Sequence, residues 1–531
     1  MKKIISILGV LFIVLITFYF MLPPLNITSP LFWSYLFLVS ILSISIIMPL
    51  TLIDAFKKRV FTKQKYFLYF PLIIGGVFLT IIIINLICSP LFNAKKYSNR
   101  IIVDETKEFI EDVDLVDFSK IPLLDKDSSQ KLGDRKMGQA TEWVSQFYVS
   151  DLYTQINYND SIIRVTPIEY AGLIKYFTNR KEGIKGYITV NSVDGQANLV
   201  KLDKGLKYMP SAFFMENLNR KLRFSYPTTI FDEASFEIDN EGNPFWIVPT
   251  IKYSGIGLKK TINGVIILDA ISGKSKKYDI NEVPNWVDHV YSADLIIEEL
   301  NNWGEYKNGF FNSIFGQKNV VNTTEGYNYL VMNDDVYFYT GITSVSTDES
   351  NLGFVLVNMR TKETNYYNVP GAEEYSAMAS AEGLVQEKNY EASFPLLINL
   401  NNKPTYLLSL KDDAGLVKMY AFVDVADYQK VVVSDASLGI EAAASKYLGE
   451  AALEYDQNKI LEKTITIDSI TTAVIDSNTY YYIIDENKKL YSTSIKTNKN
   501  LLPFLKAKDQ VKITYVEEII NNIVTIEVYN G

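Results

Sequence analysis

Two phrases, NEGNPFWIVPTIKY at 240–253 and GVIILDAISGKSKKYDI at 264–280, decide the fold of the central part of the chain. Each contains a run of apolar and β-branched residues bounded by Asn, Gly or Asp, as expected for strands joined by turns. Related phrases recur at 333–343 with 353–369, at 401–412 with 420–433, and more faintly at 186–202. The copies have no fixed period, which disfavours a propeller or a solenoid. We expect two to four degenerate repeats of antiparallel sheet.

The first copy resembles the strand–turn–strand signature of PepSY modules, which are peptidase-propeptide-like domains. The matching residues are Gly242, Pro244, Phe245, Trp246, Val248, Val265, Ile267, Asp269, Ala270 and Gly273. The later copies match through Tyr337, Val355, Val357, Asn358 and Thr361, and through Pro404, Tyr406, Val423 and Asp424. These copies lack the turn glycine, and the gap between the two strands is long and irregular. The resemblance implies a hairpin packed on a helix and a non-catalytic role, such as inhibiting or chaperoning a secreted peptidase or supporting envelope machinery.

Two segments between the strand phrases have helical patterns. Apolar residues at helical spacing predict a helix over Ala293–Trp303, with Gly304 as its stop, and the Ala/Glu/Leu-rich segment Ile440–Leu453 predicts another. The first helix leads into the aromatic segment WGEYKNGFFNSIF at 303–315. We expect this segment to pack between two repeats, and an exposed docking surface is the alternative. Its residues are Trp303, Tyr306, Phe310, Phe311 and Phe315.

The last stretch, 459–531, has the pattern of a separate small domain. Five strand-like runs fall within it, at Thr464–Ile470, Tyr480–Ile484, Leu490–Ile495, Gln510–Tyr515 and Val524–Tyr529. Short strands that must not leave long open edges tend to close into a barrel. The element KAKDQVKITY at 506–515 resembles a strand of small OB-type barrels, with Ala507 and Lys508 where Gly is usual. We expect an OB-like β-barrel. Because it has no basic and aromatic stripe, we expect no nucleic-acid partner.

Three uncharged runs dominate the N-terminus. They cover 4–22, 31–53 and 66–88, and each is long enough as a helix to span the roughly 30 Å of a bilayer's hydrocarbon core. The alternative is a cleaved signal peptide followed by buried core helices. Pro23 and Pro24 stand where a cleavage site would need small residues. We therefore predict a membrane domain over 1–92 with three transmembrane helices.

The distribution of charge predicts the orientation of these helices. Residues 1–92 carry seven cations and one anion, whereas the rest of the chain carries 45 cations and 60 anions. Cations cluster before the first run and between the second and third, so these ends are expected in the cytoplasm. Residues from about 93 onward are then extracytoplasmic, although Lys95, Lys96 and Arg100 weakly oppose this. We expect a polar connector over 93–136 and a PepSY-like ectodomain over 137–458.

The composition limits the chemistry that the chain can perform. It has one cysteine, Cys88, and one histidine, His289, which excludes a disulfide within the chain and disfavours the usual zinc sites. His289 is expected to be structural, because no G-x-S-x-G motif accompanies it. The paired acids Asp334–Asp335, Asp348–Glu349 and Asp412–Asp413 are interpreted as solvated turn residues. Hydrolysis by two carboxylates and weak calcium binding remain as alternatives.

The sequence thus predicts a membrane-anchored α+β protein with three transmembrane helices, repeated sheet-plus-helix modules and a small C-terminal β-barrel. We expect a non-catalytic scaffold, chaperone or inhibitor in the cell membrane, without metal or cofactor. Its expected partners are the lipid bilayer and another envelope protein or a cell-wall polymer. One alternative is an Asp/Glu-dependent cell-wall hydrolase. Another is an accessory subunit of a transport system, for which Asn85 is the one strongly polar side chain deep in the third run.

Overall fold

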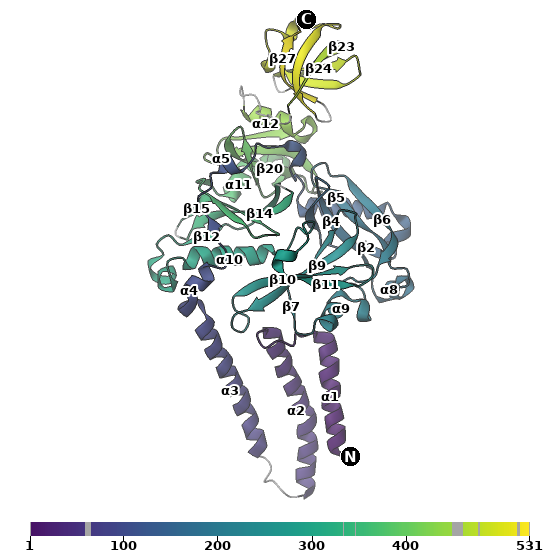
Figure 1. Cartoon of the computed structure of the whole chain (residues 1–531), viewed down its shortest axis with the longest axis vertical. Coiled ribbons are helices and arrows are strands. Elements are labelled where there is room, and N and C mark those ends of the chain that lie inside the picture. The colour runs from purple at the N-terminus through teal and green to yellow at the C-terminus, as the bar shows by residue number, and fades with distance from the viewer. Residues whose placement is uncertain are drawn as a thin grey trace. The chain divides into compact units, whose positions relative to one another are not determined.

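The computed structural model describes residues 2–58, 65–332, 334–345, 347–448, 460–475, 478–517 and 521–529. It shows a mixed α+β chain with several sheets and a closed barrel (Figure 1), which confirms the predicted fold class at this level. The chain forms two compact units. Unit 1 comprises Met1–Asp104, Leu124–Asp348 and Phe354–Tyr366, and unit 2 comprises Glu105–Leu123, Glu349–Gly353 and Tyr367–Gly531.

Four copies of one sheet module account for most strands outside the barrel. In each copy two short strands pair with the first of two longer strands, and these two longer strands pair with each other. A further strand then pairs with the second of them. The repeats expected from the sequence are therefore present, and there are four of them among the described residues.

The first module consists of β2 (Phe147–Val149), β3 (Thr154–Tyr158), β4 (Ser161–Tyr170), β5 (Ile184–Asn191) and β6 (Ala197–Leu206). The second consists of β7 (Ile230–Phe231), β8 (Ser235–Ile238), β9 (Pro244–Tyr253), β10 (Lys260–Asp269) and β11 (Ser275–Tyr278). The third consists of β12 (Val321–Thr323), β13 (Asn328–Met332), β14 (Asp335–Ser344), β15 (Thr347–Asn358) and β16 (Thr364–Tyr367). The fourth consists of β18 (Glu391–Ala392), β19 (Leu396–Leu400), β20 (Lys403–Lys411), β21 (Val417–Asp424) and β22 (Val431–Asp435).

A helix precedes the strands of each module. These helices are α6 (Lys126–Gly138), with the single turn α7 (Thr141–Val144) after it, α9 (Leu218–Ser225), α10 (Ala293–Tyr306) and α11 (Glu374–Leu384). The first module also has α8 (Leu173–Asn179) between its long strands, and α12 (Ile440–Leu448) packs on β21 and β22 of the fourth. Residues 449–453 of the second predicted helix lie outside the described residues.

Gly304 is not a helix stop, contrary to the expectation from the sequence. It lies within α10, which continues to Tyr306. A Cβ at this position would lie 1.9 Å from the backbone oxygen of Val321 in β12. The glycine therefore permits close contact between the helix and the strand, and helix stops and contact glycines cannot be distinguished from sequence alone.

All four modules use the same turn between the second long strand and the strand after it. Asn191, Asp269, Asn358 and Asp424 each end the long strand. The side-chain oxygen of each accepts hydrogen bonds from the backbone N–H groups two and three residues later, at 2.8–3.2 Å. Such Asx turns explain why the sequence copies share Asp or Asn at this position.

The residue four positions after this Asx has a left-handed backbone in three of the modules. The φ angles of Gly195, Gly273 and Lys362 are +77°, +69° and +64°. At Gly273 a Cβ would also lie 2.3 Å from the Tyr208 ring, so glycine is needed there. Lys362 adopts the same conformation with a full side chain, which explains why the sequence copy at 353–369 has no turn glycine.

The β9–β10 hairpin of the second module is buried on both faces. Trp246, Val248 and Leu268 belong to a core shared with the first module, whereas Ile247 and Ile267 belong to a second core shared with α10 and the third module. Successive side chains of a strand point to opposite faces, so a strand buried on both sides needs a continuous apolar run. This requirement explains the phrases PFWIV and VIIL in the two strands.

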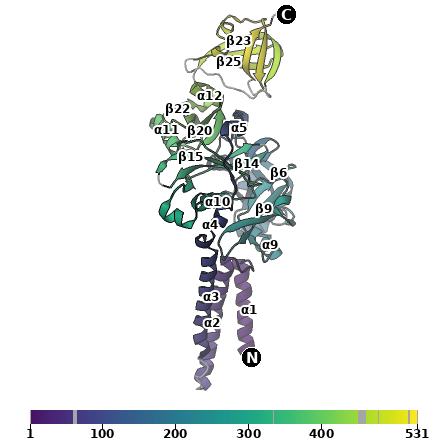
Figure 2. The ribbon, with the colours of Figure 1, turned by 60° about the vertical axis from the view of Figure 1, so that its left-hand side comes forward.

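Helices cover all three apolar runs of the N-terminus. They are α1 (Lys2–Met21), α2 (Pro30–Lys58) and α3 (Lys65–Cys88), and the short helix α4 (Pro90–Ser98) follows α3. Figures 1 and 2 show that α1 to α3 project from the same side of the folded body of unit 1. In the described part of the chain, no single helix meets the length and hydropathy expected of a membrane span. The segments Leu72–Cys88 and Pro90–Ser98, bent by 48°, meet them together.

The segment 93–136, expected to be a connector, contributes folded elements to both units. Its strand β1 (Val103–Asp104) pairs in parallel with β16, and α6 packs on β6 of the first module. In unit 2 the short helix α5 (Phe109–Asp112) lies near β20, and Phe118 is buried against Phe422. The strand β17 (Gly371–Ala372) pairs with the unit 2 part of β15. The polar composition of this segment therefore did not predict the residues that it buries in the two units.

The predicted C-terminal β-barrel is confirmed. Its strands are β23 (Leu461–Ile475), β24 (Asn478–Asp485), β25 (Leu490–Ser494), β26 (Gln510–Val516) and β27 (Asn521–Val528). They close in the order β23, β24, β25, β27, β26, with β25 and β27 parallel. A shift of register between Ile467 and Ser469 lets the long strand β23 pair with both β24 and β26. Each run of alternating residues predicted from the sequence corresponds to one of these strands.

Candidate functional site

The tip of the β9–β10 hairpin joins the body of unit 1 to the apolar helices. The Asn85 side chain of α3 donates a hydrogen bond to the backbone oxygen of Ile256 at 3.1 Å and accepts one from its N–H at 2.8 Å. The N–H of Gly257 donates to the oxygen of Thr28, just before α2, at 3.0 Å. A Cβ on Gly257 would lie 2.4 Å from Pro30. The strongly polar residue of the third apolar run is thus a docking residue for the hairpin.

Helix α9 holds the end of α1 in a similar way. The buried guanidinium of Arg223 donates to the backbone oxygen of Leu22 at 2.9 Å and to that of Thr229 at 2.6 Å. Burial lowers the pKa of Arg223 to about 10, which leaves it charged at neutral pH. The Arg220 guanidinium lies 4.2 Å from the centre of the Tyr19 ring, in the favourable position for a cation–π contact. The C-terminal end of α1 is therefore fixed to the body.

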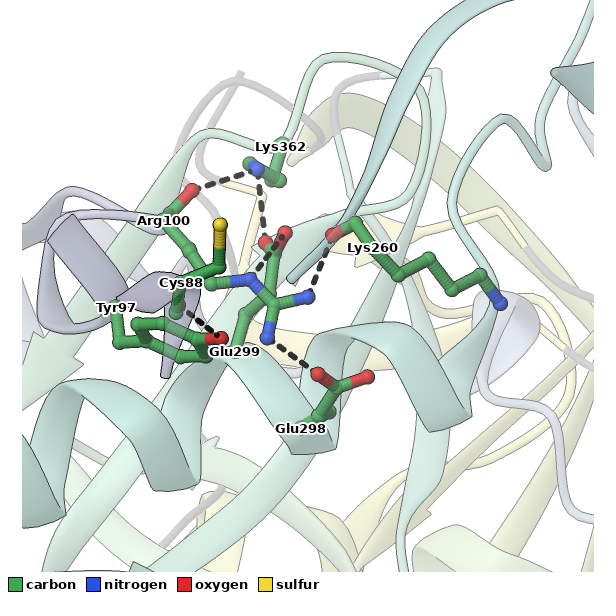
Figure 3. A network of polar contacts seen from close by, with 7 residues as sticks. All are labelled: Cys88, Tyr97, Arg100, Lys260, Glu298, Glu299 and Lys362. Carbon is green, nitrogen blue, oxygen red and sulfur yellow. Dashed lines mark hydrogen bonds and ion pairs between the residues drawn. The ribbon is translucent and has the colours of Figure 1, made fainter. Parts of the chain in front are cut away.

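A buried network of charges connects the chain after α4 with α10 (Figure 3). The Arg100 guanidinium donates to Glu298 and, at 2.6 Å, to the backbone oxygen of Lys260. Lys362 lies between the Glu299 carboxylate and the backbone oxygen of Arg100, at 2.8 Å from each. The side chains of Arg100 and Glu299 are only 2% and 1% exposed.

The electrostatics of this network favour one arrangement of its members. Burial raises the pKa of Glu299, and the charges of Lys362 and Arg100 act in the opposite direction. Removing one partner would leave a charge buried without compensation, which typically costs about 3–5 kcal/mol. The turn lysine Lys362 of the third module, the start of β10 and α10 are therefore held in a fixed relation to the chain that follows α4.

A tyrosine fixes the junction between α3 and α4 itself. The Tyr97 hydroxyl donates to the backbone oxygen of Cys88 at 3.1 Å, and its ring packs edge-on against Tyr306 of α10 at 6.2 Å. Burial raises the pKa of Tyr97. Cys88 lies against the glycine tip of the hairpin, where a Cβ on Gly255 would be 3.0 Å from its own Cβ. The single cysteine is therefore part of this packed junction.

A second polar cluster lies where the first three modules of unit 1 meet. The Glu237 carboxylate accepts hydrogen bonds from the N–H groups of Asp288 at 2.9 Å and His289 at 3.2 Å. The Asp288 carboxylate accepts one from the N–H of Asn157 at 2.9 Å. The His289 Nε2 is 2.6 Å from the backbone oxygen of Gln155. The only histidine therefore has a structural position, as expected from the sequence.

The two acids of this cluster disfavour each other's charge. Burial, followed by the neighbouring charge of Glu237, raises the pKa of Asp288 well above its usual range. Burial also raises the pKa of Glu237, against the effect of His289. A pair of carboxyl groups with raised pKa values is a common feature of catalytic sites, but buried structural networks produce it too. Here the pair bonds to the backbone N–H groups of Asn157, Asp288 and His289 and to the Ser235 hydroxyl, all within the same cluster.

The structure divides the five aromatic residues of the candidate docking surface. Trp303 packs against the core shared by the second and third modules and lies beside Tyr366. Tyr306 is half-buried and stacks on Phe310. Phe311 and Phe315 are exposed, together with Ile314, which the sequence analysis did not select. Trp303 thus packs in a core as expected, whereas docking by the exposed residues stays a prediction.

The paired acids are mostly occupied in local structure. Asp335 is held by Arg360 in a two-point ion pair, with Nε and Nη2 each at 2.7 Å, and also accepts from Asn358. Asp334 accepts from the Asn157 side chain. Asp412 accepts from the N–H of Leu416 at 2.9 Å and caps its own turn. The side chains of Asp348 and Glu349 lie outside the described residues.

Sequence reasoning selected Asn85 but did not select the other residues that join the helices to the body of unit 1. Arg100 and Arg223 resemble any other surface cation in the sequence, because their partners are distant along the chain. A signal was nevertheless present in GIG at 255–257, since closely spaced glycines between two strands indicate a close backbone approach. No protein-family model matches the chain, and no curated protein matches it.

Replacement of Asn85 by Leu is expected to loosen the hairpin tip. The substitution removes both hydrogen bonds to Ile256 and leaves its N–H and carbonyl without the partner that they have in the structure. We expect at least tenfold faster amide hydrogen exchange at Ile256, measured by mass spectrometry on the full chain in detergent. Thr80→Val is the control, because the Thr80 hydroxyl bonds only within α3, to Gly76. Equal exchange in both variants would contradict a docking role for Asn85.

The raised pKa of Asp288 predicts a pH-dependent stability. Because the folded pKa exceeds the unfolded value of about 3.9, the folded state binds the proton more tightly. Stability is therefore fully present at low pH and falls as pH rises from about 4 through the folded pKa. Asp288→Asn keeps an oxygen acceptor for Asn157 and removes the charge. We expect the fall in thermal midpoint between acid and neutral pH to be smaller in this variant.

The control for this measurement is Glu241→Gln, an exposed acid on the turn between β8 and β9. This variant should follow the wild-type profile. A profile of Asp288→Asn that is parallel to that of the wild type would show that the Asp288 carboxyl does not carry the pH dependence.

Proposed function

We propose that the chain is an integral membrane protein whose helices α1, α2 and α3 lie in a bilayer. The observation that carries this proposal is the exposure of α3. Exposed apolar side chains occur at consecutive positions along it, including Leu72, Ile73, Val77, Phe78, Leu79, Ile82, Ile83, Ile84, Leu86 and Ile87. Neighbouring residues of a helix point about 100° apart, so α3 is apolar all round. Such a helix needs an apolar environment on every side.

The other two helices support the same assignment. α1 and α2 also expose large apolar side chains, among them Phe12 and Phe37, while they pack against each other through Phe18 and Tyr35. The hydroxyls of Thr17, Ser40 and Thr80 bond to backbone oxygens within their own helices, and that of Tyr35 bonds to the oxygen of Val14 in α1. A backbone in lipid requires such internal satisfaction. The loop cations then favour a cytoplasmic N-terminus, with the body extracytoplasmic.

We propose further that the body is a non-catalytic scaffold, chaperone or inhibitor for an envelope protein or a wall polymer. The four modules, each with a preceding helix and a long central hairpin, support the resemblance to PepSY modules. The strand order of the barrel, with its parallel β25–β27 pair, supports an OB-like domain. Repeated modules without a shared catalytic constellation are typical of binding proteins.

The hydrolase alternative is less well supported by the side-chain contacts. A glycoside hydrolase needs two carboxyl groups that face a substrate between them, at separations of about 5–10 Å. Asp335 is neutralised by Arg360, and Asp412 is used to cap its turn. The transport alternative has little support from the sequence, because the second apolar run has no charge and Asn85 is the one strongly polar side chain deep in the third. That side chain bonds to Ile256 of the hairpin, which gives it a structural use outside any transport path.

The membrane orientation predicts opposite accessibility for two positions. In a Cys88→Ser background, Glu241→Cys lies in unit 1 at the end of β9 that is opposite the hairpin tip. We expect a membrane-impermeant maleimide to label it fully in intact cells. Lys57→Cys, in the basic segment after the second apolar run, should be labelled only after lysis. The reverse pattern would overturn the orientation, and full labelling of both in intact cells would overturn the membrane assignment.

A scaffold should be recovered with its partner. Tyr375, Tyr428 and Phe504 are exposed aromatic residues of unit 2. We expect that a photoreactive phenylalanine analogue at these positions gives defined cross-linked products in intact cells. The exposed turn position Glu241 serves as the comparison. Products that contain only this chain, or none at any of the three positions, would contradict binding of an envelope partner by unit 2.

A further inference from the structure

Unit 1 has two exposed apolar patches next to the outer ends of its helices. The α10 patch consists of Phe311, Ile314 and Phe315, and the α8 patch consists of Leu173, Ile174, Phe177, Phe214 and Met215. The side chains of Phe315 and Ile174 are 80% and 78% exposed. Large side chains gathered in this way are costly in water and are typical of an interaction surface.

The α10 patch is presented by a loop that is held from within. The Asn308 and Asn312 side chains both donate to the backbone oxygen of Lys318, at 3.1 and 3.0 Å. Gln317 turns the chain with a φ of +46° and bonds back to Asn312. These hydrogen bonds hold the loop together while the side chains of Phe311, Ile314 and Phe315 stay exposed.

The α8 patch is also held in place by local polar contacts. Tyr176 is the buried member of α8, and its hydroxyl donates to Glu216 at 2.7 Å and to the backbone oxygen of Phe213 at 3.1 Å. Arg180 also pairs with Glu216, at 3.0 Å. These contacts fix α8 to the loop that carries Phe214, and the rings of Phe177 and Phe214 lie 5.9 Å apart on the outer side.

Each patch is connected to the outer end of an apolar helix. On one side Phe310, next to the α10 patch, stacks on Tyr306, which packs against Tyr97 of α4. On the other side Arg220 donates to the backbone oxygen of Phe214 at 2.8 Å and covers the Tyr19 ring of α1. In Figure 1, α8 and the α4 end of α10 lie to the right and left of the helix ends that join the body.

Exposed cations accompany the apolar side chains of both patches. Lys95 and Lys96 of α4, together with Lys307 and Lys318, belong to the segments around the α10 patch, and Lys181 follows α8. Apolar and aromatic side chains bordered by Lys or Arg are the composition of segments that lie in the interface of an anionic bilayer. An anionic lipid interface beside α4 would also account for Lys95 and Lys96, whose positive charge weakly opposed the orientation predicted from the loop cations.

We propose that the α10 and α8 patches insert into the outer lipid interface, so that unit 1 rests on the bilayer at two points beside its helices. The inference rests on the proposed membrane anchoring. The binding partner that we propose for both patches is a lipid surface with anionic headgroups, not a protein. The two contacts would prevent the body from tilting about the helix ends.

The experiment uses the full chain with Cys88→Ser, reconstituted as single copies in nanodiscs of phosphatidylcholine and phosphatidylglycerol. An environment-sensitive NBD fluorophore is attached to Phe315→Cys, Ile174→Cys, Leu79→Cys or Glu241→Cys. Glu241 is the control, because the whole of β9, about 30 Å of extended strand, separates it from the hairpin tip that touches α3. Quenching is measured with lipids that carry a spin label near the start of the acyl chain.

We expect blue-shifted emission and several-fold stronger quenching at positions 315 and 174 than at 241. Leu79 reports on the anchoring itself and should be quenched whatever happens at the patches. Quenching at 79 with none at 315 and 174 would overturn the inference and leave the anchoring intact. A blue shift at 315 or 174 without quenching would point to a protein contact and would equally overturn it. Loss of quenching at 79 would overturn the proposed function first.

Discussion

The burial of both faces of the β9–β10 hairpin is the constraint on which the rest of unit 1 depends. One face, with Trp246 and Leu268, completes the core of the first module, and the other, with Ile247 and Ile267, completes the core beneath α10. Neither core could exclude water without it. Because the strand alternates between the faces, a shift of one residue would exchange every side chain between two different cores. The register of this hairpin therefore fixes the relation of three modules.

The same hairpin also contacts the apolar helices. Because its strands are fixed in two cores, these contacts also fix the helices relative to the body of unit 1. Its tip forms two hydrogen bonds with Asn85 and one with the oxygen of Thr28. Its second strand begins at Lys260, whose backbone oxygen receives the Arg100 guanidinium. A movement of α3 would thus be transmitted to a strand that cannot shift within its cores. In the proposed membrane setting, the helices and the body of unit 1 would move as one piece.

The sequence predicted those features that depend on local patterns. The apolar runs gave the positions of α1 to α3, the alternating runs gave the barrel strands, and the Asp or Asn residues gave the repeated turn. It did not predict the split short strands, since β7 and β18 have two residues each, too few for a periodicity to appear. It could not pair Arg100 with Glu299, since charge alone does not identify a partner about 200 residues away. It could not separate Trp303 from Phe315 either, because composition does not say which side of a segment faces the core.

The charged network beside the helix ends is better explained by specificity than by stability. A buried ion pair gains little over well-packed apolar residues, because desolvation offsets most of the attraction. An apolar junction between helices and body would, however, tolerate sliding, and beside an apolar bilayer it would also compete with lipid for the same surfaces. In the proposed membrane setting, the buried charges of Arg100, Glu299 and Lys362 would be excluded from lipid and would mark where the helices end and the body begins. The exposed apolar patches then lie just beyond a boundary that charge has already set.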